Sequence, residues 1–319
     1  MTGSHQPAPD HSEASTLPSD TPPISSLGPI LSDGEGILQP PMDNTPNDAP
    51  DPDSVPARIP HLGHVLLFAA LGGSIFLIVQ LTLLGITQSR HINSNDIPAH
   101  YLLASEAFTW LATLTAAWFI FPPLWQRSFA TGIQLNPPAA ARNALKLIPI
   151  GITLSYIVQA VSSLITMPKS IPMDDFFRTP SDVWLITAFG TLLAPFFEEI
   201  VFRGFLLPAI AIAYDWLSLP RTEAARSTWN SSNRISSPAL LFSAILTSTL
   251  FAAIHGKQTD FTWPVLLLLF GVSLILTAIR LRLRSVLAST VVHASYNFAV
   301  FLTAFIATGG YRHLDRLTH

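Results

Sequence analysis

The chain has 319 residues, of which 49% are apolar and 12% are charged. This charged fraction is about half that of an ordinary globular protein. The charges are also unevenly placed, because residues 1–57 hold nine Asp or Glu and no Lys or Arg, which leaves the rest of the chain net positive. These figures exclude a soluble enzyme of ordinary composition and a basic protein with a nucleic-acid partner, and they favour an integral membrane protein.

The chain contains no cysteine, which excludes disulfides, thiolate metal ligands, a cysteine nucleophile and lipidation of cysteine. Any metal ion would therefore be held by His, Asp, Glu or Asn side chains, and any nucleophile would have to be something other than a thiol.

The first 60 residues form a separate region by composition, since they contain 13 of the 27 prolines among Ser, Asp, Asn and Thr. Such a stretch buries too little apolar surface to offset the entropy lost on ordering. We therefore expect residues 1–60 to be a disordered acidic arm. The arm does not resemble a secretory signal peptide, because a basic region followed directly by a short apolar core is missing.

Seven apolar segments follow the arm, and most are long enough to cross a hydrocarbon core about 30 Å thick as an α-helix. They cover residues 62–86, 102–121, 147–167, 183–217, 239–254, 263–279 and 285–308. No ten-residue alternation typical of a barrel is present, so helices are the remaining way to satisfy the backbone in lipid. The predicted fold class is all-α, a polytopic transmembrane bundle of about 7–8 helices. Its expected parts are N-terminal helices over 61–182, a functional core over 183–308 and a tail over 309–319.

The segment 183–217 can cross the membrane once or twice, and the positive-inside rule barely separates the two possibilities. Counted from the starts of their segments, Glu198 and His255 lie about 15 and about 16 residues deep, or about 22–24 Å. At these depths the two side chains meet only if the two segments run in the same direction. We therefore expect a turn after Glu199 and eight segments in all.

Ionisable residues inside membrane spans are costly and usually mark a function. Glu199 and Arg203 are four residues apart on a predicted helix, so they face the same side and can pair. Glu198 points about 100° away from Glu199 and is free to act as a general base. Alternatively, both carboxylates serve only to neutralise Arg203 and to hold two helices together.

Two further clusters lie on later apolar segments. Phe251 and His255 are four residues apart, so the phenyl ring can support the orientation of the imidazole. His293 and Asn297 have the same spacing, and together they can donate hydrogen bonds to a developing oxyanion or bind a metal ion. The same pair can instead form a hydrogen bond between helices, which is common in membrane proteins.

The order Glu-Glu-x-x-x-Arg, Phe-x-x-x-His and His-x-x-x-Asn on successive apolar segments resembles the CPBP family, the CAAX proteases and bacteriocin-processing proteins also called ABI. The resemblance covers about residues 183–308. Flanking residues agree with it, namely Ala194-Pro195, Phe202-Arg203-Gly204 and Ala288-Ser289. The motifs of other intramembrane proteases are missing: His-Glu-x-x-His, Gly-x-Gly-Asp and Gly-x-Ser-Gly.

The resemblance implies an intramembrane endopeptidase that hydrolyses a peptide bond of a membrane-bound or prenylated substrate. No Ser or Cys nucleophile is evident, so water is the expected nucleophile. We expect Glu198 and His255 to activate the water. The oxyanion is then expected to be stabilised by His293 and Asn297.

A metal-dependent version of the reaction uses the same side chains. His255, His293 and a Glu would supply the three protein ligands that a catalytic Zn²⁺ usually takes. The absence of a His pair at i, i+4 spacing speaks against a tightly held zinc.

Two other classes of function remain open from the residues. One is a transporter, in which Glu106, Glu198 and His255 relay protons or cations; the other is a catalytically silent membrane scaffold. We find no internal duplication of the kind that many transporters show. The expected location is a bacterial-type plasma membrane. The Arg280–Arg284 loop indicates that its own end of the bundle is cytoplasmic, whereas the eukaryotic CAAX relatives have a cytosol-facing site at the opposite end of that helix.

Overall fold

The computed structural model describes residues 58–92, 97–165 and 179–317. The predicted disordered arm therefore lies outside the described residues except for its last three. All regular structure in the described ranges is helical, and seven helices are long and apolar enough to cross a membrane. This confirms the predicted all-α polytopic bundle.

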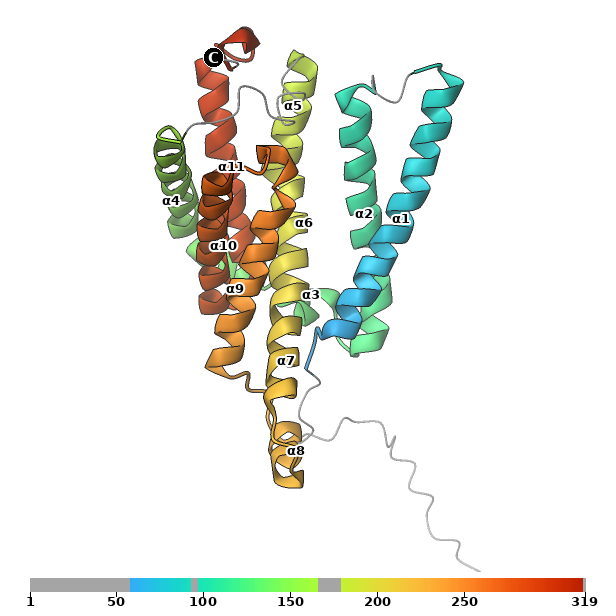
Figure 1. The fold of residues 1–319 in the computed structure, drawn as a ribbon, viewed down its shortest axis with the longest axis vertical. Helices are drawn as coiled ribbons and strands as arrows, with labels where there is room; N and C mark the ends of the chain where they lie inside the picture. The colour runs from blue at the N-terminus through green and yellow to red at the C-terminus, as the bar shows by residue number, and fades with distance from the viewer. Residues whose placement is uncertain (1–57, 93–96, 166–178, 318–319) are drawn as a thin grey trace, which may run out of the picture. The chain divides into compact units, whose positions relative to one another are not determined.

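The seven spans alternate in direction along the chain, as Figure 1 shows. They are α1 (Leu62–Ser89), α2 (Ala99–Trp125), α4 (Pro137–Ser162), a continuous helix from Pro180 to Ser218, α9 (Ser237–Ile254), α10 (Trp263–Leu283) and α11 (Val286–Ala307). The short helices α3 (Phe129–Gly132) and α8 (Glu223–Asn230) lie in the connections, together with 3₁₀ turns at Lys257–Thr259 and Leu314–Leu317.

The helix Pro180–Ser218 has 39 residues and changes its hydrogen-bond register twice. It is made of α5 (Pro180–Ala188), a π-helical stretch (Phe189–Leu193), α6 (Ala194–Glu199), a second π-helical stretch (Ile200–Leu206) and α7 (Leu207–Ser218). Pro195 and Pro208 lie just after the two π-helical stretches, where each removes one N–H donor from the helix. The wider turns accommodate this loss, so the helix continues through both prolines.

The expected turn after Glu199 and the eighth crossing are therefore wrong. At about 1.5 Å per residue the helix Pro180–Ser218 is about 58 Å long, nearly twice the hydrocarbon core, and Glu198 lies near its midpoint. Asp215 accepts hydrogen bonds from the backbone N–H of Ser236 at 2.8 Å and from its hydroxyl at 2.5 Å, which fixes the start of α9 beside α7. Glu198 and His255 each lie about five turns from this junction, so two antiparallel helices bring them level.

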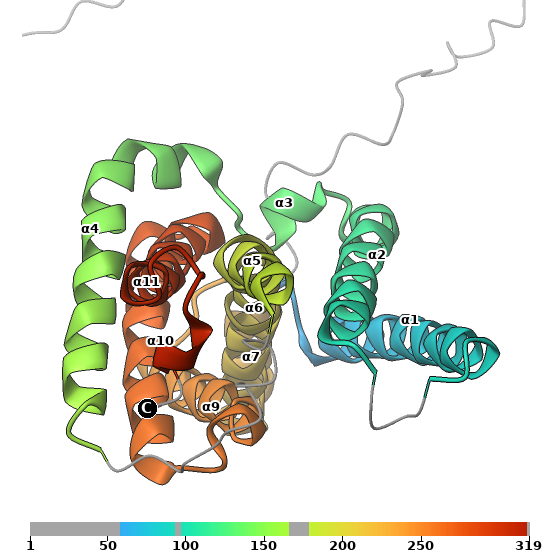
Figure 2. The same cartoon turned by 90° about the horizontal axis from the view of Figure 1, so that it is seen from above.

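Helix α11 packs against α4, α10 and α6, and Figure 2 shows it beside α4. The starts of α4 and α11 are joined, because the Ser285 hydroxyl donates to the carbonyls of Leu135 and Asn136 at 2.9 and 3.0 Å. Further along, Gly151 of α4 lies so close to the backbone of Val292 that a side-chain carbon there would overlap it. A glycine at this position permits the close approach of α4 to α11. The segment of α11 that carries His293 is thereby held from two sides.

Helices α1 and α2 pack against each other, and both contact the helix Pro180–Ser218. An aromatic core forms where α1, α2 and α3 meet the second π-helical stretch, with Phe68, Phe121, Trp125, Phe129 and Phe205 buried together. This core holds α2 beside the helix that carries Glu198 and Glu199.

Candidate active site

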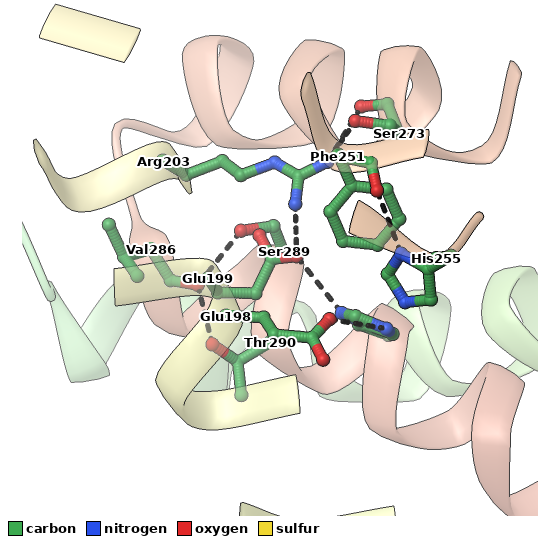
Figure 3. Close-up of polar contacts among 10 residues, drawn as sticks. Glu198, Glu199, Arg203, Phe251, His255, Ser273, Val286, Ser289 and Thr290 are labelled. Carbon is green, nitrogen blue, oxygen red and sulfur yellow. Dashed lines mark hydrogen bonds and ion pairs between the residues drawn. The ribbon is translucent and has the colours of Figure 1, made fainter. Parts of the chain in front are cut away.

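A fully buried ion pair lies at the centre of the candidate site. Arg203 Nη1 donates to Glu199 Oε1 at 2.8 Å, and both side chains have 0% exposure. Arg203 Nη2 donates to the carbonyl and the hydroxyl of Ser273 on α10 at 3.0 and 2.7 Å. Figure 3 shows Arg203 between Glu199 and Ser273. This is the pairing that the i, i+4 spacing predicts, and Ser273 links it to a second helix.

His293 of α11 lies between the two adjacent glutamates. Its Nδ1 is 3.0 Å from Glu199 Oε1, and its Nε2 is 3.9 Å from Glu198 Oε2. Because Glu199 is paired with Arg203 and acts as a hydrogen-bond acceptor, Nδ1 of His293 carries the hydrogen of this bond. Glu199 therefore orients the ring and turns Nε2 toward Glu198. Glu198, in contrast, makes no hydrogen bond within the described residues and stays free for chemistry.

His255 follows directly after α9, and its ring is fixed by Phe251. The Nδ1 of His255 is 2.7 Å from the carbonyl oxygen of Phe251, and the two rings lie 4.7 Å apart. A carbonyl only accepts hydrogen bonds, so Nδ1 carries the hydrogen of this bond and Nε2 is left without a partner in it. The Phe251 ring also contacts His293 at 5.8 Å and faces the Arg203 guanidinium at 4.9 Å. Phe251 therefore positions both imidazoles.

Asn297 replaces one backbone hydrogen bond that is missing from the long helix. Its Nδ2 donates to the carbonyl oxygen of Gly190 at 2.7 Å. In the first π-helical stretch the Ala194 N–H donates to the carbonyl of Phe189, five residues earlier. By the same spacing the carbonyl of Gly190 would accept from Pro195, which has no N–H. The Asn297 amide takes the place of this missing donor. One of its two amide hydrogens is used in this way, and the other remains available.

The side chains that keep a free hydrogen-bonding atom line one cavity of about 490 Å³, which lies between α2, the helix Pro180–Ser218, α9, α10 and α11. Its lining includes the predicted site residues Glu198, His255, His293 and Asn297. Glu199 and Arg203 lie behind this wall and are buried. The lining continues to Lys257, Gln258 and Thr259, in the loop after α9. The cavity therefore extends from membrane depth to one end of the bundle.

The predicted metal ligands fit a metal ion poorly. Within the described ranges, no three His, Asp or Glu side chains come together in a way that could hold a metal ion. His293 uses Nδ1 for Glu199 and His255 uses Nδ1 for Phe251, so each ring offers only Nε2. A catalytic zinc usually takes three protein ligands; the two Nε2 atoms and the Glu198 carboxylate are donors of the right type, but the described structure does not group them closely enough to hold the ion. The zinc site thus stays a prediction.

Spacing along one helix reveals some of these residues but not their partners on other helices. Glu199–Arg203 and Phe251–His255 follow from i, i+4 spacing. Ser273 binds Arg203 and Gly190 binds Asn297, and neither partner was among the residues predicted for the site. A signal exists for Ser273, since Ser273, Thr277 and Arg280 form a polar face in an otherwise apolar segment. No such signal exists for Gly190, because its role depends on the π-helical register.

Comparison with known proteins is consistent with this geometry. Residues 180–299 match a family model described as type II CAAX prenyl endopeptidase Rce1-like. This confirms the resemblance inferred from the motifs, and the matched range contains Glu198, Glu199, Arg203, His255, His293 and Asn297. No curated protein matches the chain, and no solved structure does.

Proposed function

We propose that the chain, whose residues 180–299 match the Rce1-like family model, is an intramembrane endopeptidase that cleaves a peptide bond of a membrane-associated or prenylated substrate. The observation that carries the proposal is the meeting of Glu198, His255 and His293 from three helices in one cavity at membrane depth. The family supports a protease of the CAAX type, while the substrate and the mechanism are our proposals.

In the proposed mechanism Glu198 is the general base. It lines the cavity, has no hydrogen-bond partner among the described residues, and lies next to a carboxylate already neutralised by Arg203. Glu198 takes a proton from water while the water oxygen attacks the scissile carbonyl carbon. His255 accepts a second hydrogen bond from this water through Nε2, which its bond to Phe251 leaves free. When the tetrahedral intermediate collapses, the proton passes from Glu198 to the leaving amine.

His293 and Asn297 stabilise the oxyanion in this mechanism. His293 acts as an imidazolium between the carboxylates of Glu199 and Glu198, at 3.0 and 3.9 Å, and donates through Nε2. Asn297 donates the amide hydrogen that its bond to Gly190 leaves available. Both donors are held in place before the substrate arrives, which is the condition under which such hydrogen bonds accelerate a reaction most.

The test compares the wild-type protein in lipid vesicles with Glu198→Gln and His255→Ala, using a farnesylated reporter peptide. Loss of a general base lowers the rate about 10²–10⁴-fold, so we expect at least about a 10²-fold fall in kcat for Glu198→Gln. Glu223→Gln and His313→Ala change the same residue types at exposed positions on α8 and near the C-terminus. These two controls should keep wild-type kcat. Undiminished cleavage by both site variants would contradict the hydrolytic assignment.

The same assay tests the metal-free mechanism. Since every step of the proposed mechanism uses protein groups and water alone, we expect a chelator to leave kcat unchanged. A loss of activity that added Zn²⁺ restores would overturn this part of the proposal and show that the reaction depends on a metal ion. In that case the nucleophile would be a metal-bound water.

A further inference from the structure

Glu106 on α2 is a third carboxylate in the candidate active site, and it lies outside the matched range 180–299. It shares one helix face with Leu103 and Trp110, three residues before and four residues after it, and all three line the cavity of Glu198. Helix α2 packs against α5 and the first π-helical stretch, so this face forms one wall of the cavity. The Glu106 side chain is exposed there, which leaves it accessible to a molecule in the cavity.

Glu106 has no partner of opposite charge in the part of the chain that the structure describes. It forms no hydrogen bond or ion pair there, and the carboxylate acting on it is the like charge of Glu198. A carboxylate within a membrane span is costly unless a cation, a hydrogen-bond donor or water stabilises it. The chain thus maintains a second carboxylate in the cavity of its proposed general base, and no described residue of opposite charge pairs with it.

The other charged groups of the cavity do not balance Glu106. Among the described residues, Lys257 is the one Lys or Arg in the cavity lining, and it lies in the loop after α9 without an ion pair to Glu106. Arg203 is buried behind the wall and is paired with Glu199. His255 and His293 face Glu198 from α9 and α11, and Tyr296 is the remaining titratable group in the lining. The α2 side of the cavity is therefore negative.

We propose that Glu106 determines substrate specificity by binding a cationic side chain, Lys or Arg, of the substrate beside the scissile bond. This inference rests on the proposed function, because it places the cation in the cavity where Glu198 acts. An ammonium or guanidinium group would form a charge-assisted hydrogen bond with the Glu106 carboxylate. The low dielectric of the membrane interior strengthens such a pair relative to water. A neutral residue at the same substrate position leaves Glu106 unbalanced and binds less tightly.

The test uses pairs of farnesylated peptides that differ only by Lys or Gln at one position near the cleaved bond. The full-length protein in vesicles should prefer one Lys peptide over its Gln counterpart by at least about tenfold in kcat/KM. In Glu106→Gln this preference should fall to about one, mainly through a higher KM for the Lys peptide. Glu106→Asp should retain part of the preference, and Glu106→Lys should favour a peptide with Glu at that position. The surface variant Glu223→Gln should keep the wild-type preference.

Three outcomes overturn the proposal. One is a wild-type protein that cleaves every Lys and Gln pair equally well. Another is a Glu106→Gln variant that loses kcat for both peptides by the same factor, which assigns Glu106 to the chemistry of Glu198 or to the fold. The third is a wild-type protein that cleaves none of the peptides, and this result contradicts the proposed function itself. The first two leave the proposed function intact, so the two failures are distinguishable.

Discussion

At the scale of single residues, the buried Glu199–Arg203 pair determines where His293 points. The chain of contacts runs from Ser273 through Arg203 and Glu199 to the imidazole. Removing one partner of a buried ion pair leaves an uncompensated charge and usually costs about 3–5 kcal/mol. Arg203→Met should therefore lower the free energy of unfolding by about this amount and abolish cleavage. Denaturant unfolding of the detergent-solubilised protein, followed by circular dichroism, measures the loss.

A double variant separates charge balance from positioning. Replacing Glu199 by Gln and Arg203 by Met removes both charges, so much of the stability lost in Arg203→Met should return. Cleavage should stay low, because the Gln side chain lacks the negative charge with which Glu199 holds the His293 imidazole in place. If the double variant is as unstable as Arg203→Met, the loss arises from packing and the charge argument is wrong.

At the scale of elements, the approach of α4 to α11 depends on Gly151. A Cβ atom at this position would overlap the Val292 carbonyl oxygen and lie 2.7 Å from Ser295 Cβ, so the helices would have to separate. Val292 directly precedes His293, and separation at this point moves the imidazole away from Glu198 and Glu199. Gly151→Ala should therefore lower both the thermal unfolding temperature and kcat.

The matched control for this prediction is Gly271→Ala in α10. A Cβ atom at Gly271 meets nothing within 4 Å, and an alanine is intrinsically favoured over glycine in a helix. This variant should keep its activity and its unfolding temperature. Equal behaviour of the two variants would mean that the close contact at Gly151 does not constrain α11.

The difference between the predicted and the observed elements has a physical cause. Apolar segments and i, i+4 pairs depend on residues close together in the chain, so the sequence indicated the bundle and the Glu199–Arg203 pair. The helix Pro180–Ser218 is continuous because a π-helical stretch precedes each of Pro195 and Pro208. A hydrophobic pattern does not indicate such a change in backbone hydrogen bonding. The partners of Arg203 and Asn297 belong to other helices, and packing alone brings them together.

At the scale of the whole molecule, seven crossings determine which basic residues share an end of the bundle. Ten of them lie at the end where α1 begins and α8 is found, namely Arg58, Arg127, Arg142, Lys146, Arg221, Arg226, Arg234, Arg280, Arg282 and Arg284. The positive-inside rule assigns such an end to the cytoplasm. The cavity extends to the opposite end, where Lys257 and Gln258 follow α9. We therefore expect the active site to open on the non-cytoplasmic side, unlike the cytosol-facing site of the eukaryotic CAAX relatives.

The absence of cysteine makes this orientation directly measurable, because each introduced cysteine is the single thiol of the chain. Gln258→Cys places a thiol at the mouth of the cavity, and Ser231→Cys places one after α8 at the basic end; both positions are exposed. In intact cells a membrane-impermeant maleimide should label Gln258→Cys at once and Ser231→Cys only after permeabilisation. The wild-type protein should stay unlabelled throughout. The reverse pattern would place the mouth of the cavity in the cytoplasm and the end with the ten basic residues outside it, which would contradict the positive-inside assignment.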